Sequence, residues 1–479
     1  MTMMQNSQFT LVDPMLTHQT NGHNEVGVSE SGERKQPTVA LLPCCDVFED
    51  FFDTIGLSLE TFCNELTGGW MFNYIEALQL AGVRTVLFFV SSRVSETVRL
   101  KHQPTGATIC VMPSPKIYRA YRAMRRQAVD VSGGTIKAKA SDVQAKVSNR
   151  RSRLEAIKDG IKSLGSYVST PLGLLIKELR REGCDAILCQ DYEYVRFDTC
   201  VLLGKLMRLP VFATFQGGER LASIVEYPSR WLAMRLSTGL IIATQTEIQR
   251  VRANYSVAPA KIARIFNPMN VMTWRAINRD KTRAALGIPT DATVVVYHGR
   301  MEIWLKGLDI LLEAWNQICR ERPGKELRLL LVGTGSDANE LQQQITNMQL
   351  QGVVWVNEYV RSRTAIQQYL SAADVYTLPS RKEGFPVAPI EAMACGLPVV
   401  ATDAPGVPDI LEKGEESGGI VVPRNDVAAL ALALGRVLDD SSMRHQLGKA
   451  ARCRAEECFS LEAIGKQLRD FLLTSKTSI

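Results

Sequence analysis

Runs of consecutive apolar residues recur along the chain and alternate with stretches of helical periodicity. In the first half the runs of strand length are Thr38 to Leu42, Arg84 to Val90, Asp185 to Cys189, Pro210 to Thr214 and Gly239 to Ala243, with a helical pattern over Trp70 to Leu80. Strands that are apolar throughout are typical of parallel sheets that helices cover on both faces. The pattern therefore predicts an α/β domain with a parallel sheet.

A second series of apolar runs starts near Thr293 and repeats the same alternation. Its runs are Thr293 to Gly299, Leu327 to Val332, Val353 to Val356, Val375 to Leu378 and Leu397 to Ala401. We therefore expect two doubly wound α/β domains in tandem, 38–275 and 276–458, followed by a closing helix in 459–479 that Ser460 caps. A ligand site is expected between the domains, where the strands of such sheets end.

Composition narrows the class of protein only slightly. The 479 residues are 46% hydrophobic and 22% charged, and no apolar run approaches the ~20 residues that span a bilayer. The 11 cysteines form no C-x-x-C pair, which favours reduced thiols in a cytoplasmic protein over a metal cluster. Residues 1–37 are polar and lack the regions of a signal peptide, so we expect a disordered tail.

The charge is concentrated in one segment. The segment from Lys116 to Lys162 contains thirteen Lys and Arg residues and four acids, a net charge of +9. The whole chain carries +6, so the remaining residues carry −3. Apolar residues alternate with these cations, and we expect the insertion 116–162 to dock an anionic membrane surface or a lipid-phosphate-linked acceptor rather than nucleic acid. A merely solvated helix is the alternative.

Two glutamates after a strand carry the first candidate chemistry. Glu383 precedes the turn Gly384-Phe385-Pro386, and Glu391 lies in a short helix predicted over Val387 to Ala394. The free N–H groups of such a turn and helix start stabilise an anion such as a phosphate. Glu391 can accept two hydrogen bonds from the cis-diol of a ribose, and Glu383 can bind a hydroxyl beyond the phosphates.

Two cations after the first strand of the second domain complete this set. Arg300 offers a planar fork and Lys306 a compact ammonium, two complementary ways to hold a diphosphate. No Asp-x-Asp motif that would hold a divalent cation occurs in the chain, which fits a metal-free mechanism. We expect Arg381 and Lys382 to be surface charges and His298 to be a structural histidine.

These motifs together resemble the C-terminal domain of the retaining GT-B glycosyltransferases of family 4, also called group 1. The resemblance covers roughly 294–421 and rests on G-R-x3-W-L-K-G-L-D, L-V-G-T-G and P-S-x2-E-G-F-P-x3-I-E-A-M-A-C-G-L-P-V-V-A-T, in order and spacing. It implies a GT-B fold of two facing Rossmann-like domains with a cleft between them. It also implies a nucleotide-sugar donor that the second domain binds, and transfer with retained anomeric configuration.

The resemblance also assigns roles to individual residues. It implies that Arg300 and Lys306 bind the donor diphosphate and that Glu391 binds the ribose. It also implies that the sugar and the phosphates are bound by Glu383 and by the backbone amides of the turn, Gly384, Phe385, Pro386 and Val387. The backbone near Val360 is implied to bind the base. Catalysis would then rest on Glu383, Arg300 and Lys306.

The first domain resembles the family less closely. Gly68 and Gly69 match the family's glycine-rich loop, which brings backbone close to the donor phosphates and the acceptor. An acidic and aromatic insertion between Pro43 and Gly68 predicts an acceptor side of its own shape. Gln216 stands where many members carry a histidine near the reacting carbon, and an amide cannot act as an acid or a base.

Two other classes of function compete with this one. Gly333 to Ala338 fits G-x-G-x-x-A after a strand, and Glu358 follows at the distance of the dinucleotide fingerprint, which favours an NAD(P)-dependent Rossmann enzyme. A non-catalytic sugar-nucleotide-binding scaffold is the other alternative.

We favour a metal-independent retaining hexosyltransferase without a cofactor, with UDP-glucose as first choice of donor and a glycan or lipid-linked acceptor in polysaccharide synthesis. The head of the chain is similar to cyanobacterial exopolysaccharide and envelope-polysaccharide glycosyltransferases. We expect a cytoplasmic protein that is peripheral at the inner face of the membrane.

Overall fold

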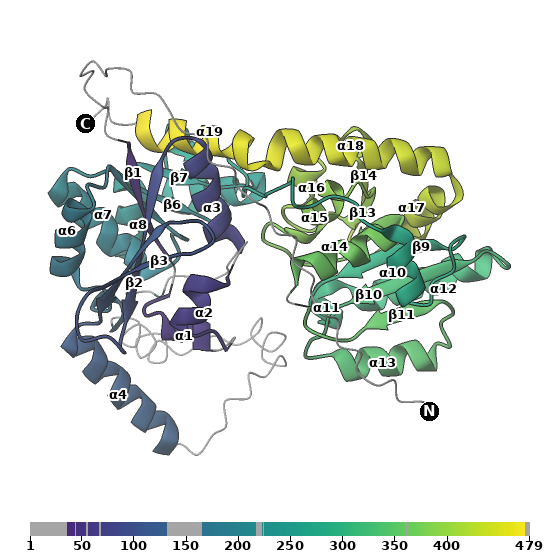
Figure 1. Cartoon of the computed structure of the whole chain (residues 1–479), viewed down its shortest axis with the longest axis horizontal. Helices are drawn as coiled ribbons and strands as arrows, with labels where there is room; N and C mark the ends of the chain where they lie inside the picture. The colour runs from purple at the N-terminus through teal and green to yellow at the C-terminus, as the bar shows by residue number, and fades with distance from the viewer. Residues whose placement is uncertain are drawn as a thin grey trace, which may run out of the picture. The chain divides into compact units, whose positions relative to one another are not determined.

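The structure is a computed structural model that describes residues 36–43, 45–53, 56–66, 69–131, 165–216, 223, 225–360 and 362–474. Within these residues the strands form two sheets, each flanked by helices (Figure 1). The tail expected over 1–37 lies outside the described residues except for its last two positions, and so does residue 132 onward of the basic insertion, up to 162.

The first sheet contains eight of the described strands in the order β3-β4-β2-β1-β5-β6-β7-β8. The bounds are β1 Thr38–Leu42, β2 Arg84–Ser91, β3 Val98–Lys101, β4 Thr108–Pro113, β5 Ala186–Cys189, β6 Val211–Thr214, β7 Gly239–Ile241 and β8 Ile262–Ala263. All pairs are parallel except β3 with β4. All five residues of β1 are buried, as the uninterrupted apolar pattern predicts for a central strand.

Helices connect these strands and cover the sheet. Their bounds are α1 Glu49–Phe52, α2 Leu59–Asn64, α3 Gly69–Leu80, α4 Lys116–Val131, α6 Leu172–Arg181, α7 Val195–Met207, α8 Tyr227–Leu236 and α9 Gln245–Tyr255. Two separate buried clusters form around the sheet, one with Val39 and Leu41 and the other with Ala40 and Leu42. The alternate residues of β1 therefore face opposite layers, which is the doubly wound arrangement.

The second sheet contains six of the described strands, all parallel, in the order β11-β10-β9-β12-β13-β14. The bounds are β9 Thr293–His298, β10 Leu327–Val332, β11 Val353–Val356, β12 Val375–Leu378, β13 Val399–Thr402 and β14 Gly419–Val422. Its helices are α10 Arg279–Ala285, α11 Ile303–Lys306, α12 Leu308–Glu321, α13 Ala338–Asn347, α14 Arg363–Ala372, α15 Ala388–Ala394, α16 Val407–Ile410, α17 Val427–Asp439 and α18 Ser441–Phe459. The chain order reverses between β9 and β12, and ligands bind at such a point in open α/β sheets.

The last helix, α19 Leu461–Thr474, belongs to the core of the first sheet rather than the second. Figure 1 shows it along α3, and the close approach of Gly465 to the carbonyl of Ala77 confirms this contact. A Cβ at position 465 would lie 2.1 Å from that oxygen. Ser460 Oγ accepts a hydrogen bond from the N–H of Ala463 at 3.2 Å, as the predicted cap requires.

Aromatic residues of the insertion before α3 are packed against the first sheet, whereas acids such as Asp53 and Glu60 are exposed. Phe48, Phe52 and Phe62 contact one another and Phe89 of β2 with ring centroids 4.2 to 6.0 Å apart. The carboxylate of Glu49 is buried and accepts hydrogen bonds from Ser91 Oγ and from the N–H of Ser92. The insertion therefore covers the carboxyl end of β2.

Candidate functional site

The candidate residues of the second domain come from loops that follow adjacent parallel strands. Arg300 and Lys306 follow β9, and Glu383 follows β12, which pairs with β9 in parallel. Glu391 lies one turn inside α15, the helix after the same loop. Because the carboxyl ends of parallel strands meet at one edge, the topology gathers these side chains there.

Lys306 and Glu383 form a mostly buried ion pair. The distance from Lys306 Nζ to Glu383 Oε1 is 2.7 Å, and the two side chains are 13% and 11% exposed. Ser380 Oγ donates a second hydrogen bond of 2.6 Å to the same oxygen. The low dielectric around the pair strengthens its attraction, so each partner orients the other.

Glu391 is held by a histidine that we expected to be only structural. Nε2 of His298, the last residue of β9, lies 2.9 Å from Glu391 Oε2. His298 is 8% exposed, and its Nδ1 is buried without a partner among the described residues. The ring therefore fixes the orientation of one carboxylate oxygen of Glu391, whose side chain is 22% exposed.

Arg300 lies in the loop between β9 and Lys306, but its guanidinium contacts neither Glu383 nor Glu391. Its side chain is 65% exposed and Nη1 binds Glu302 Oε1 at 2.7 Å. The buried phenol of Tyr297 donates a hydrogen bond of 3.0 Å to the carbonyl of Arg300, and burial raises the pKa of that phenol above its usual value. The loop backbone is therefore fixed while the guanidinium stays accessible.

The turn Gly384 to Val387 is held by its surroundings rather than by its own hydrogen bonds. Phe385 stacks on Phe266 with centroids 5.5 Å apart, and it is 8% exposed. A Cβ on Gly406 would lie 2.6 Å from the carbonyl of Gly384, so only glycine fits beside the turn. Among the described residues, the N–H groups of Gly384, Phe385 and Val387 donate no hydrogen bond. These donors can bind an anion.

The expectation that Arg381 is a surface charge is wrong. Its side chain is 14% exposed, and its two terminal nitrogens each lie 2.7 Å from the carboxylate of Asp309. Nη1 also donates to the carbonyl of Trp304. Arg381 therefore ties the loop after β12 to the loop and helix after β9, where its planar fork matches a carboxylate.

The glycines of the dinucleotide-like motif make room for protein backbone. A Cβ on Gly333 would lie 2.1 Å from the carbonyl of Gly299, and one on Gly335 would lie 2.5 Å from the carbonyl of Met301. Asp337 in the same loop accepts a hydrogen bond from the N–H of Ile303 at 2.8 Å. The motif therefore supports the loop that carries Arg300, and nothing in it requires a dinucleotide.

Val360 is the least defined of the predicted donor-binding positions. It follows β11 by four residues and packs, partly buried, against the core of the second sheet. Among the described residues, no hydrogen bond joins Val360 to Lys306, Glu383 or Glu391.

The candidates of the first domain are only partly described. Gly68 lies outside the described residues, and Gly69 is the first residue of α3. Gln216 follows β6 and forms a reciprocal amide pair with Asn267, with N to O distances of 3.0 and 3.2 Å. Tyr74 of α3 donates to the same Asn267 oxygen at 3.3 Å. Gln216 is thus fixed in orientation by groups that cannot take up a proton at neutral pH.

Sequence reasoning missed a buried carboxylic acid beside Gln216. Asp191 follows β5, is 5% exposed and adopts φ 60°. Burial raises its pKa to about 7, although hydrogen bonds from the N–H groups of Glu193 and Gln216 oppose that rise. The only sequence signal was a single acid shortly after an apolar strand, in Cys189-Gln190-Asp191. One acid in this position is too common to indicate a functional site.

Among the described residues, no three or more His, Cys, Asp or Glu side chains lie together in a way that could hold a metal ion. The candidate set consists instead of two carboxylates, two cations and free backbone donors. Such a set suits a ligand that carries both phosphates and hydroxyls.

The second domain is similar in sequence to known glycosyltransferases. Residues 278–454 match the model of the family Glycosyl transferases group 1. The D-inositol 3-phosphate glycosyltransferase of Saccharomonospora viridis is 33% identical over 224 residues, which cover 45% of this chain and 51% of that protein. The chain thus spans about half the length of the curated relatives it matches. The similarity to these glycosyltransferases is reported for the second domain.

Solved structures match nearly the whole chain. Sucrose-phosphate synthase from Thermosynechococcus elongatus has a TM-score of 0.58 at 21% identity and covers 90% of this chain and 97% of that one. HepE of Anabaena in complex with UDP has a TM-score of 0.61 at 18% identity and covers 91% and 100%. HepE with UDP-glucose gives 0.57 at 17% identity, covering 91% and 99%. The predicted fold, two Rossmann-like α/β domains of the GT-B type, is confirmed.

Proposed function

We propose that this chain is a glycosyltransferase that moves a hexose from a nucleotide sugar to a glycan or a lipid-linked acceptor in polysaccharide synthesis. The reaction retains the anomeric configuration and requires no metal ion or cofactor. The observation that carries the proposal is the pairing of Lys306 with Glu383 and of His298 with Glu391 at one edge of the second sheet.

Each group of the site has a part in holding the donor. Arg300, Lys306 and the free amides of the turn after Glu383 bind the diphosphate. Glu391, oriented by His298, accepts both hydroxyls of the ribose, and Glu383 accepts a hydroxyl of the sugar while its other oxygen stays with Lys306. The backbone near Val360 contacts the base.

The chemical step follows from where negative charge develops. The acceptor oxygen bonds to the anomeric carbon on the face from which the diphosphate leaves, as the bond from that carbon to the phosphate oxygen breaks. The acceptor proton passes to the departing phosphate oxygen. Charge grows on the diphosphate during this step, so Arg300, Lys306 and the turn amides stabilise the transition state more than the ground state.

The first domain supplies the groups next to the acceptor hydroxyl that reacts. Gly68 and Gly69 let backbone approach the donor phosphates and the acceptor. The amide nitrogen of Gln216 already donates to Thr214 Oγ1 and to Asn267 Oδ1, so Gln216 meets an acceptor hydroxyl through its oxygen, which accepts a hydrogen bond but takes no proton. This role agrees with a departing phosphate that acts as the base.

The names of similar proteins support the choice of donor more than that of acceptor. HepE was solved with UDP and with UDP-glucose. Curated relatives are named for D-inositol 3-phosphate, and one solved structure is named for sucrose phosphate. These names point to different acceptors, so UDP-glucose is the first donor to test and the acceptor is sought among glycans and lipid-linked sugars.

The basic insertion supports a place at an anionic membrane surface on the cytoplasmic side. Its described part is α4, which is anchored by Arg122 to Asp50 at 2.7 Å and by Tyr118 to Asp46 at 3.2 Å. Lys116, Ile117 and Arg119 are exposed on the same helix. Cations next to apolar side chains suit a layer of anionic lipid headgroups. None of the described helices is long and apolar enough to cross a membrane.

Proton NMR of the reaction products tests both the donor and the stereochemistry. The protein is incubated in EDTA with UDP-, GDP- and ADP-glucose and with the matching galactose donors, and the anomeric proton of the released or transferred sugar is followed. We expect an α-anomer as the first product from the α-linked donor. A β-anomer as first product would contradict the retaining mechanism, and turnover only with a divalent metal would contradict metal independence.

A further inference from the structure

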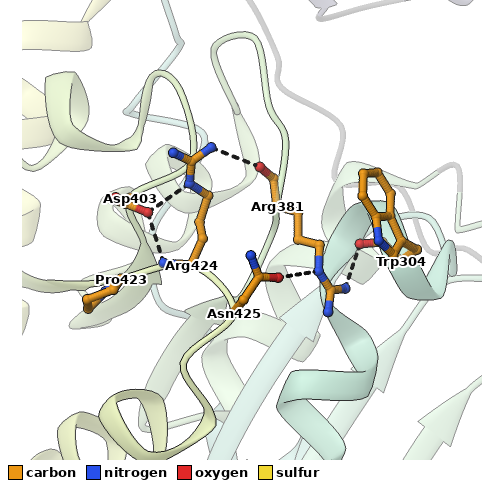
Figure 2. A pocket seen from close by; sticks show the side chains of 6 residues that line it. All are labelled: Trp304, Arg381, Asp403, Pro423, Arg424 and Asn425. Carbon is orange, nitrogen blue, oxygen red and sulfur yellow. Dashed lines mark hydrogen bonds and ion pairs between the residues drawn. The ribbon is translucent and has the colours of Figure 1, made fainter. Parts of the chain in front are cut away.

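A polar pocket lies at the carboxyl edge of the second sheet. It shares no residue with the proposed donor-binding set. It has a volume of about 470 Å³, and its lining is Trp304, Arg381, Asp403, Pro423, Arg424 and Asn425. Figure 2 shows these side chains converging from loops after β9, β12, β13 and β14. The volume lies in the range of small-molecule sites.

The pocket is linked to the donor-binding set through backbone. Asp403 directly follows Thr402, whose hydroxyl donates a hydrogen bond to the carbonyl of Ser380. Ser380 in turn binds Glu383. Trp304 precedes Lys306 by two residues. The two sites are therefore neighbours along the same strand ends.

The charges that line the pocket are already neutralised. Asp309 pairs with both terminal nitrogens of Arg381, and Asp403 Oδ1 binds Arg424 Nε at 2.9 Å. An anion would have to compete with these carboxylates for each guanidinium. The pocket therefore suits a neutral ligand better than a phosphate.

Hydrogen-bonding capacity remains on the pocket wall. Asp403 Oδ1 accepts from both the N–H and Nε of Arg424, while Oδ2 accepts from no described residue. Asn425 Oδ1 is taken by Arg381 Nε, and Asn425 Nδ2 donates to none of the described residues. One free carboxylate oxygen and one free amide donor can bind neighbouring hydroxyls.

An exposed aromatic ring completes the pocket. Trp304 of α11 is 51% exposed, whereas Leu308, the first residue of α12, is buried. Arg381 lies 5.8 Å from the centroid of its ring. The flat apolar surface of an indole matches the C–H face of a pyranose, while a polar wall matches its hydroxyls.

We propose that this pocket binds a neutral sugar ring, with Trp304 as the stacking surface and Asp403, Arg424 and Asn425 as partners of its hydroxyls. Given the proposed function, on which this assignment rests, the sugar ring belongs to the acceptor glycan. The pocket then selects an extended saccharide acceptor independently of the donor.

Saturation-transfer NMR of the full chain with neutral trisaccharides tests the proposal without any turnover. The probes are maltotriose, cellotriose and laminaritriose, each in the millimolar range, with inorganic phosphate as a competitor. Trp304→Ala removes the stacking surface and Trp304→Phe keeps a smaller one. Asp403→Asn alters the hydroxyl partner without removing volume. Trp231→Ala is the matched control, since Arg235 lies 4.4 Å from the centroid of that ring in the first domain.

We expect at least one trisaccharide to bind the wild type and to bind Trp304→Ala about tenfold more weakly, the loss of roughly one stacking contact. Asp403→Asn weakens binding severalfold, Trp304→Phe lies between, and Trp231→Ala matches the wild type. Binding of no probe, or equal binding by Trp304→Ala, overturns the proposal. Displacement of the sugar by phosphate also overturns it, because the pocket is then an anion site.

Failure of the proposed function gives a different result. If the wild type binds a trisaccharide through Trp304 but turns over no nucleotide sugar, the sugar-binding pocket stands and the transferase does not. If nucleotide sugars are turned over but no trisaccharide binds, the transferase stands and the pocket assignment fails.

Discussion

His298 Nε2 lies 2.9 Å from Glu391 Oε2, so the last residue of the central strand β9 orients a carboxylate on the helix that follows the neighbouring strand β12. The contact is mostly buried, and water has little access to replace it. It makes His298 a positioning residue for whatever Glu391 binds.

Replacing His298 should therefore weaken nucleotide binding. A hydrogen bond to a charged group contributes about 1.5–3 kcal/mol, so we expect His298→Leu to raise the dissociation constant of UDP about tenfold or more. His298→Gln keeps an N–H donor and should recover most of the affinity. Calorimetric titration with UDP in EDTA measures both variants. Equal affinities for His298→Leu and the wild type would refute the positioning role.

The Lys306–Glu383 pair should matter for both stability and turnover. Lys306→Ala leaves Glu383 without its cation in a mostly buried place, which costs about 3 kcal/mol of unfolding free energy. The variant also lacks a positive charge that stabilises the diphosphate in the transition state. We therefore expect kcat/KM for the donor to fall about 10²-fold or more.

Lys325→Ala is a matched control for this variant. Lys325 also binds a carboxylate at 2.7 Å, that of Asp439, but the two side chains are 51% and 43% exposed. An exposed pair contributes about 1 kcal/mol at most. Urea unfolding and donor turnover of the two variants should differ accordingly, and equal losses of turnover would remove Lys306 from the site.

Asp191 gives the protein a specific dependence of stability on pH. Its pKa is about 7 in the folded chain against 3.8 ordinarily, so between these values the folded state holds more protons than the unfolded state. Stability contributed by the neutral acid is therefore lost as the pH rises from about 4 to 7. Asp191→Asn should melt at a higher temperature than the wild type at pH 8, and the gap should close toward pH 4. A gap that is constant with pH would contradict the buried-acid interpretation.

The basic insertion predicts binding to anionic lipid. Each Lys or Arg near such a surface contributes about 1 kcal/mol, so Arg150→Gln, Arg151→Gln and Arg153→Gln together should sharply reduce co-sedimentation with vesicles that contain phosphatidylglycerol. The exposed cations Lys281, Lys413 and Lys449 of the second domain, changed together to Gln, serve as the control. Wild-type co-sedimentation that depends on neither anionic lipid nor salt would count against a membrane surface as partner.

Most strands were predictable because their signal is local. Each strand of the second sheet except β14 coincides with a predominantly apolar run, and so do β1, β2, β5, β6 and β7. The edge strand β3 was missed because Val98–Lys101 alternates apolar and charged residues, and the short apolar run of β4, Thr108–Pro113, was not recognised as a strand. No local pattern predicts that α19 packs on the first sheet. Its apolar face indicates that the helix packs against another element but not which one.

The candidate site was predictable to the level of loops but not of contacts. Spacing and resemblance brought together the loops of Arg300, Lys306, Glu383 and Glu391. The contact of His298 with Glu391 depends on which strands are neighbours, and no sequence pattern reports that. Arg381 was misjudged because a lone arginine in a polar loop is usually exposed, whereas here Asp309 lies within reach of both its terminal nitrogens.

The most direct test of the account is release of nucleoside diphosphate from a nucleotide sugar in the presence of EDTA, compared between the wild type and Glu391→Gln. The wild type should release UDP from UDP-glucose, or the corresponding diphosphate from another of the UDP-, GDP- and ADP-sugars, without added metal. Glu391→Gln should raise KM for that donor. Release from no nucleotide sugar, or a reaction that depends on NAD(H), would contradict the central claim.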